Sequence, residues 1–168
     1  GNLIFRAAFD ATGNEPWITD GTLVGTQMLK NINVSPAANA SSSMGAPVLF
    51  NGKAYFSAID TLNGAELWVT DGTVDGTKLV KNINAGKTNS SPLFLTVAGG
   101  QLFFRATDTL GGTELWKTDG TTAGTVMVKD IFSGRTAANV LQNSNPTQFV
   151  AFGNKLIFTA IDTSGSEL

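Results

Sequence analysis

The sequence predicts an all-β fold made of repeated, four-stranded antiparallel units, and three observations support this prediction. A block of the form Glu-x-Trp-x-Thr-Asp-Gly-Thr begins at Glu15, Glu66 and Glu114, and a fourth copy opens at Glu167. The segments between these blocks contain short runs rich in β-branched and aromatic residues. No stretch of the chain has a convincing helical periodicity. We therefore expect a β-propeller-like array of about 3.3 repeats, each of roughly 48–54 residues.

One complete unit shows the expected order of strands. Its four predicted strands cover residues 77–84, 92–98, 101–108 and 114–118. We expect the first of these to be innermost and the Trp-bearing strand to be outermost. Pro16 stands where the later copies have Leu, and proline, which lacks an N–H donor, is tolerated at a sheet edge. With this phase, the chain divides into a half unit, two full units and an incomplete unit, at 1–25, 26–75, 76–124 and 125–168.

Two kinds of turn recur with the strands. Thr-Asp-Gly-Thr follows each Trp strand, where Asp can accept from its own backbone and Gly can adopt positive φ. A second turn spans residues 60–66, 108–114 and 162–167 and again carries glycine. Nearly all acidic residues thus recur once per unit, whereas an active site needs a single set. We interpret them as turn formers and strand-end partners.

The remaining connection differs between units in length and composition. These three segments, which we call the variable segments, cover residues 34–46, 85–91 and 133–145. We expect each to join the inner two strands of a blade, so that all emerge on one face and are free to carry recognition. The candidate ligand-binding residues on them are Asn39, Ser41, Lys87, Asn89, Arg135 and Asn143.

Composition excludes several classes of function. The 168 residues include neither Cys nor His, which rules out disulfides, thiolate nucleophiles, Ser-His-Asp triads and the usual zinc sites. A net charge of −2 with scattered Lys and Arg disfavours nucleic acid as a partner. No apolar run reaches the roughly 20 residues needed to span a bilayer, so we expect no membrane insertion. We therefore predict that the chain is not an enzyme.

The repeated acids could instead bind calcium, because carboxylate and amide oxygens in a short glycine-bearing loop are ligands that this ion prefers. The candidate metal ligands are Asp60, Asn63, Glu66, Asp108 and Glu114. Gly111 replaces Asn63 in the next copy, and backbone and water would have to supply most of the oxygens. We therefore favour the structural interpretation and predict no cofactor other than Ca²⁺.

Two further residue types repeat, each with two possible roles. Lys30, Lys81 and Lys129 could line a central channel that attracts an anion, or could pair with a repeated carboxylate, which we favour. The tryptophans could stack on sugars, but their fixed place in the repeat and their apolar neighbours favour burial.

The repeated block resembles two known families. Glu-Leu-Trp-x-Thr-Asp-Gly-Thr-x-x-Gly-Thr, followed by Leu-Val-Lys-Asn-Ile at 79–83, is similar to the ELWxTDGT repeats of large secreted or surface-attached bacterial proteins. Ala-x-Asp-x-x-x-Gly-x-x-Leu-Trp, at 58–68 and 106–116, resembles the tryptophan-docking repeat of quinoprotein-type propellers. The second resemblance implies that Trp17, Trp68 and Trp116 dock between neighbouring blades. It also implies that Gly64 and Gly112 give the indole room and that Ala58 and Ala106 pack beneath it.

Together these observations predict a non-enzymatic segment of a secreted or cell-surface bacterial β-propeller that serves in adhesion, binding or as a scaffold. A lectin-like propeller with one sugar site per blade is the alternative, and a fragment of a quinoprotein-type enzyme is a third. We expect a protein or glycan partner at a surface. We also expect the remaining blades to come from the same longer chain or from homo-oligomerisation, since propellers typically need four to eight blades.

Overall fold

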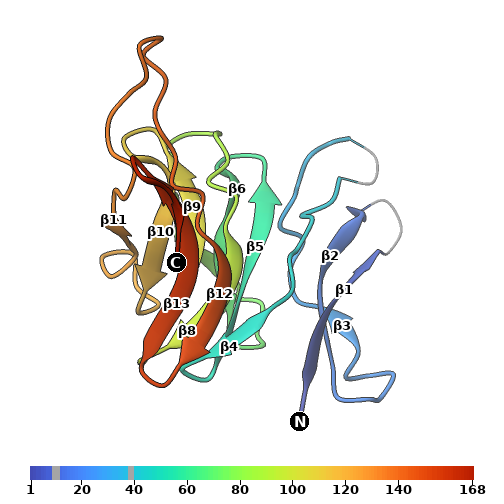
Figure 1. Ribbon diagram of the computed structural model, residues 1–168. Helices are drawn as coiled ribbons and strands as arrows, with labels where there is room; N and C mark the ends of the chain where they lie inside the picture. Colours follow the sequence, from blue (N-terminus) through green and yellow to red (C-terminus); the bar gives the residue numbers. More distant parts are fainter. Residues whose placement is uncertain (9–11, 38–39) are drawn as a thin grey trace.

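The computed structural model describes residues 1–8, 12–37 and 40–168, and no α-helix occurs among them (Figure 1). Four antiparallel sheets of three or four strands follow one another along the chain, which confirms the predicted all-β class. In the described part of the chain, no helix is long and apolar enough to cross a membrane.

Within every sheet the strands lie side by side in sequence order. The first sheet contains β1 (Leu3–Ala8), β2 (Asn14–Thr19) and β3 (Gln27–Met28). The second contains β4 (Val48–Phe50), β5 (Lys53–Asp60), β6 (Gly64–Thr70) and β7 (Lys78–Lys81). The third contains β8 (Leu93–Ala98), β9 (Gln101–Asp108), β10 (Gly112–Thr118) and β11 (Val126–Lys129). The fourth contains β12 (Thr147–Phe152), β13 (Lys155–Asp162) and β14 (Gly165–Glu167).

The predicted grouping of strands into sheets was wrong by one strand. The strand after Thr-Asp-Gly-Thr pairs with the preceding Trp strand, with Trp68 opposite Leu79, and not with the strand that follows it. The variable segments therefore connect consecutive sheets, and the Trp strand is internal, not outermost. Pro16 occupies the place of Leu67, where a bulge interrupts the pairing of β6 with β7, and proline is tolerated at a bulge as well as at an edge.

Apolar side chains fill the space between neighbouring sheets. On β9 the side chains of Leu102, Phe104 and Ala106 are fully buried, alternating with more exposed residues, as expected for a strand with one face on the core. They pack with Tyr55 and Leu67 of the second sheet. β6 is buried along its whole length because a neighbouring sheet covers each of its faces.

The Thr-Asp-Gly-Thr loops also contact the preceding sheet. Gly72 has a φ of 91°, and a Cβ at this position would lie 3.2 Å from Cδ1 of Ile18. Gly120 has a φ of 97°, and its Cβ would collide with the hydroxyl of Tyr55. The backbone conformation thus requires glycine at these two positions, and the preceding sheet leaves little room for a side chain at either.

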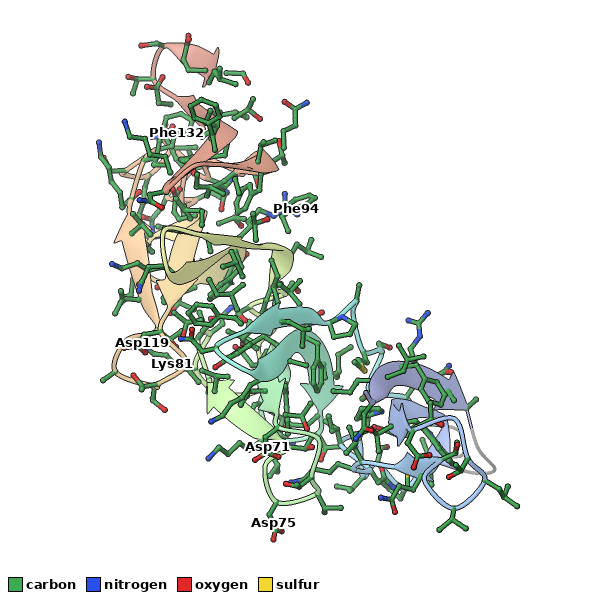
Figure 2. All side chains as sticks on the ribbon, turned by 90° about the horizontal axis from the view of Figure 1, so that it is seen from below. Asp71, Asp75, Lys81, Phe94, Asp119 and Phe132 are labelled. Atoms are coloured by element: carbon green, nitrogen blue, oxygen red, sulfur yellow. The ribbon has the colours of Figure 1, made fainter. Side chains whose placement is uncertain are left out.

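The sheets converge along their first strands. β8 contacts both β4 and β12, and the labels of these three strands lie together in Figure 1. The rings of Phe94 and Phe149 are 5.8 Å apart, and those of Phe149 and Phe158 are 5.9 Å apart, joining the third sheet to the fourth. Seen from below, the four sheets form a row from the N-terminal to the C-terminal sheet (Figure 2).

Candidate functional site

The two ends of the sheets carry different loops. Because successive strands run in opposite directions, the β5–β6 and β9–β10 turns lie at the same end as the variable segments. We call this the variable end. The loops at 71–77 and 119–125, which join β6 to β7 and β10 to β11, lie at the other end, the Thr-Asp-Gly-Thr end.

At the variable end, each described variable segment is fastened to its sheet by a buried glutamate. The carboxylate of Glu66 accepts hydrogen bonds from the backbone N–H groups of Ile83 (2.9 Å), Asn84 (3.3 Å) and Ser90 (3.2 Å). The hydroxyl of Ser90 donates a fourth bond, at 2.6 Å. The glutamate therefore holds the two ends of the variable segment beside each other. We call this arrangement the glutamate clamp.

The clamp recurs in the neighbouring units. Glu15 accepts from the N–H groups of Ile32 and Ser42, at 3.0 and 3.1 Å. Glu114 accepts from those of Ile131 and Ser144, at 3.0 and 2.8 Å. The three glutamates are fully buried, as are Ser42, Ser90 and Ser144.

Burial sets the electrostatics of the clamp. It raises the pKa of Glu15 and of Glu66, because a low-dielectric surrounding penalises the charged form. The hydrogen bonds from the serine and the backbone N–H groups act in the opposite direction and stabilise the carboxylate. These glutamates lie beneath the variable segments and do not present an acid or base to solvent.

The serines of the clamp were not singled out from the sequence. Ser42, Ser90 and Ser144 all lie at the end of a variable segment, a nearly constant distance before the next repeated glutamate. This nearly constant spacing could have identified the serines from the sequence. It shows that the variable segments differ in length before the serine, whereas the residues after it keep their place in the repeat.

Two predicted ligand residues act on the backbone next to the clamp. Oδ1 of Asn89 accepts from the N–H of Ala65 at 2.8 Å, and Oδ1 of Asn143 accepts from the N–H of Thr113 at 2.7 Å. A Cβ on Gly64 would lie 2.6 Å from the same Asn89 oxygen. The glycine thus makes room for the variable segment, and not for an indole as the resemblance implied; Gly112 has the same relation to Asn143.

The other predicted ligand residues occupy varied positions. Lys87 and Arg135 are exposed, and Arg135 donates from Nη1 to the carbonyl of Asn139 at 2.9 Å. Ser41 is half-buried and donates to the carbonyl of Asn14. Asn39 lies outside the described residues.

The predicted calcium ligands of one turn are directed to different partners. Oδ1 of Asp60 accepts from the N–H of Leu62 at 2.9 Å, and Oδ2 accepts from Nδ2 of Asn63 at 2.7 Å. Asp108 likewise accepts from the N–H groups of its own turn. Glu66 and Glu114 are occupied in their clamps. In the part of the chain that the structure describes, no group of three or more acidic side chains is placed to hold a metal ion.

The repeated lysines connect neighbouring sheets. Nζ of Lys30 donates to the carbonyl of Thr77 at 2.8 Å, and Nζ of Lys81 donates to that of Thr125 at 2.7 Å. Lys81 also lies 5.9 Å from the ring centre of Trp116, and Figure 2 shows it beside the loop of Asp119. For these two lysines, the favoured pairing with a repeated carboxylate was therefore wrong, whereas a ring of ammonium groups around a central channel stays a prediction. Their partners are backbone carbonyls, which the sequence does not reveal.

Two of the three tryptophans are buried between sheets. Trp68 is 6% exposed and packs with Ala58, and Trp116 is 5% exposed and packs in one cluster with Ala106. Trp17 in the first sheet is only half-buried. The burial of Trp68 and Trp116 leaves no accessible ring face for stacking on a sugar.

The arrangement thus consists of clamps that fix segments of differing length and composition at one end of a repeated scaffold. No protein-family model matches the chain, and neither a curated protein nor a solved structure shows a significant match to it.

Proposed function

We propose that the chain is a non-catalytic arc of a β-propeller-type array that displays its variable segments for binding at a bacterial cell surface or in a secreted protein. One observation carries this proposal. The three buried glutamates, Lys30 and Lys81, and the Asp of each Thr-Asp-Gly-Thr turn are engaged with backbone groups, whereas residues 85–89 and 133–140 of the variable segments are exposed.

The chemistry of the exposed residues favours recognition over catalysis. The acids of the clamps are buried under the segments, so they are not placed to transfer protons to a bound molecule. What faces solvent at 133–140 is a set of hydroxyl, amide and guanidinium groups from Ser133, Arg135, Thr136 and Asn139. Such groups suit hydrogen bonding to a protein surface or to sugar hydroxyls.

A variant that alters only the exposed part of a variable segment tests this proposal. Residues 136–139 are replaced by Gly-Ser-Gly-Ser, leaving Asn143 and Ser144 to close the clamp. We expect the parent chain to bind a glycan array or an extracellular-matrix protein coating, and the variant to lose this binding with an unchanged melting temperature.

The matched control lies at the opposite end of the sheets. Leu23→Ser with Val24→Ser alters side chains that are 93% and 91% exposed, on the loop that follows Asp20. This control should bind as the parent does. Binding to glycans selects the lectin-like alternative, and binding to protein coatings selects adhesion. Equal binding by the parent and the 136–139 variant would contradict the role of this segment.

A further inference from the structure

A pocket of about 310 Å³ lies between the second and third sheets, at the start of their first strands. Both of these sheets have all four strands. None of the residues that line the pocket is charged, and its wall combines apolar side chains with one hydroxyl: Ala46, Val48, Ser57, Leu93, Phe94 and Leu95. The pocket therefore suits a ligand with an uncharged, largely apolar body.

The corresponding place between the third and fourth sheets is occupied by side chains. In the repeat, Ala46 corresponds to Phe94, and Ser57 corresponds to Arg105. The ring centres of Phe94 and Phe149 are 5.8 Å apart, and the guanidinium of Arg105 lies 5.0 Å from the centre of the Phe94 ring. Ala46 and Ser57 are too short to make such contacts, so the pocket between the second and third sheets stays open.

The backbone also differs between the two places. Phe94 has a φ of 59°, which is rare for a bulky side chain, and it lies in a bulge, which redirects side chains. Pro47 follows Ala46, and the residue before a proline favours an extended conformation. The second sheet thus directs no ring across the gap. Phe94 itself remains 44% exposed as part of the pocket wall, on the side of the sheets opposite to Lys81 (Figure 2).

Ser57 adds a hydrogen-bonding group to the pocket. Its carbonyl accepts from the N–H of Gly45 at 2.9 Å, but its hydroxyl makes no hydrogen bond within the described residues. The side chain is half-buried and lines the pocket. A hydroxyl carried by a ligand can therefore donate to Oγ of Ser57 or accept from it.

We propose that this pocket binds a small hydroxylated aromatic molecule with up to two fused rings. The ring lies between Ala46 and Leu95, at the place that Phe94 fills in the next pair of sheets, and the hydroxyl bonds to Oγ of Ser57. An apolar cavity of about 150 Å³ holds one benzene molecule, so a pocket of about 310 Å³ accommodates two fused rings. This site goes beyond the proposed function, because none of the exposed residues 85–89 and 133–140 lines it.

Methyl NMR spectroscopy of the full chain, with 2-naphthol as the ligand, tests the proposal. Val48 and Leu95 line the pocket, so the shifts of their methyl signals report binding at this place and not at another apolar surface. We expect both signals to titrate with one Kd, and naphthalene, which lacks the hydroxyl, to bind about fivefold more weakly. No shift of these methyls, or equal affinities for the two compounds, would overturn the proposal.

Three variants of the chain locate the ring and the hydroxyl. Ala46→Phe fills the pocket and should abolish binding, whereas Leu49→Phe adds a ring at an exposed position of β4 outside the pocket and should leave the affinity unchanged. Ser57→Ala should weaken binding of 2-naphthol about fivefold and leave that of naphthalene unchanged. Circular dichroism establishes that all three are folded. Parent-like affinity of Ala46→Phe, or equal losses for both compounds in Ser57→Ala, would contradict the proposed placement of the ligand.

Discussion

Glu66 and Asp71 stand at opposite ends of the same strand, and their carboxylates perform the same task in different surroundings. Each accepts hydrogen bonds from backbone N–H groups. Asp71 is exposed and accepts from the N–H and hydroxyl of Thr73, two residues along the chain. Glu66 is fully buried, and its donors come from distant parts of the sequence. One acid shapes a local turn, whereas the other joins a variable segment to its sheet.

The difference extends to the pKa values. The short hydrogen bonds to Thr73 lower the pKa of Asp71, whereas burial raises that of Glu66. A local turn can be remade by a neutral side chain of the same shape, because water satisfies what is lost. A buried clamp is harder to replace, because water does not reach its N–H donors; only the N–H of Ser90 has a second acceptor, the carbonyl of Ala65 at 3.0 Å. The repeat supplies a matched control for each test of this comparison.

The largest effect is expected for Glu66→Ala. This change removes both carboxylate oxygens, so the buried N–H donors of Ile83 and Asn84 lose their acceptor. We expect a loss of about 3 kcal/mol in the free energy of unfolding, measured by urea denaturation. Glu167→Ala changes the same repeat position where the side chain is exposed, and should have little effect. Equal losses for the two variants would show that the clamp does not depend on burial.

Removing one donor of the clamp should have a smaller effect. Ser90→Ala deletes the hydroxyl that donates to Oε2 of Glu66 and leaves the three N–H bonds in place. We expect a loss of about 1–2 kcal/mol by the same measurement. Ser91→Ala, at the exposed neighbouring position, is the control and should be close to the parent. A loss for Ser91→Ala as large as that for Ser90→Ala would contradict the role of the Ser90 hydroxyl.

Much of this fold could be predicted from the sequence, because the repeated block fixes where strands and turns occur. The assignment of strands to individual sheets was harder to predict from the sequence. Every strand has a connecting loop at each of its ends. The residues of the loop at 71–77 do not show whether it joins two strands of one sheet or two separate sheets. The hydroxyls of Thr70 and Thr77 lie 2.7 Å apart across this hairpin, so the recurring Thr pair was the one local sign of it.

The clamp was missed for another physical reason. Glutamate is usually exposed, so its recurrence suggested a strand-end partner at the surface. Most of its actual partners are backbone N–H groups, which every residue except proline has, so no sequence motif marks them; the clamp serine alone recurs in the sequence. The lysine contacts were missed for the same reason, since Lys81 donates to a carbonyl of the next sheet.

The Thr-Asp-Gly-Thr end has its own link between sheets, which should weaken when Lys81 is neutralised. Lys81→Met keeps the apolar stem near Trp116 but removes the donor to the carbonyl of Thr125. We expect a loss of about 1 kcal/mol, measured by urea denaturation. Lys129→Met alters the same repeat position on β11, the edge strand of the third sheet. The Lys129 side chain is exposed, so this variant serves as the control. If Lys129→Met is equally destabilising, the loss does not come from the link to Thr125.

The smallest effects are expected in the pH dependence of stability, where the two acids should act with opposite signs. The pKa of Glu66 is raised on folding, so protonation of its carboxylate favours the folded state. This contribution to the free energy of unfolding is fully present below about pH 4.5 and is lost as pH rises through the folded pKa. The pKa of Asp71 is lowered, so its contribution is present above about pH 3.8 and is lost as pH falls towards the folded value.

Urea denaturation from pH 3 to 7 measures both slopes. Glu66→Gln should flatten the decline on the neutral side. Asp71→Asn should flatten the decline on the acid side and lose, at pH 7, the small contribution of the ionised carboxylate, while Asn keeps the turn itself. Asp75→Asn, an exposed acid in the same loop that is not part of the repeated turn, is the control for the acid side. Slopes of the same sign for the two acids would mean that hydrogen bonding outweighs burial in the clamp. The carboxylates at both ends would then be alike in their energetics, and only the distance along the chain to their donors would distinguish them.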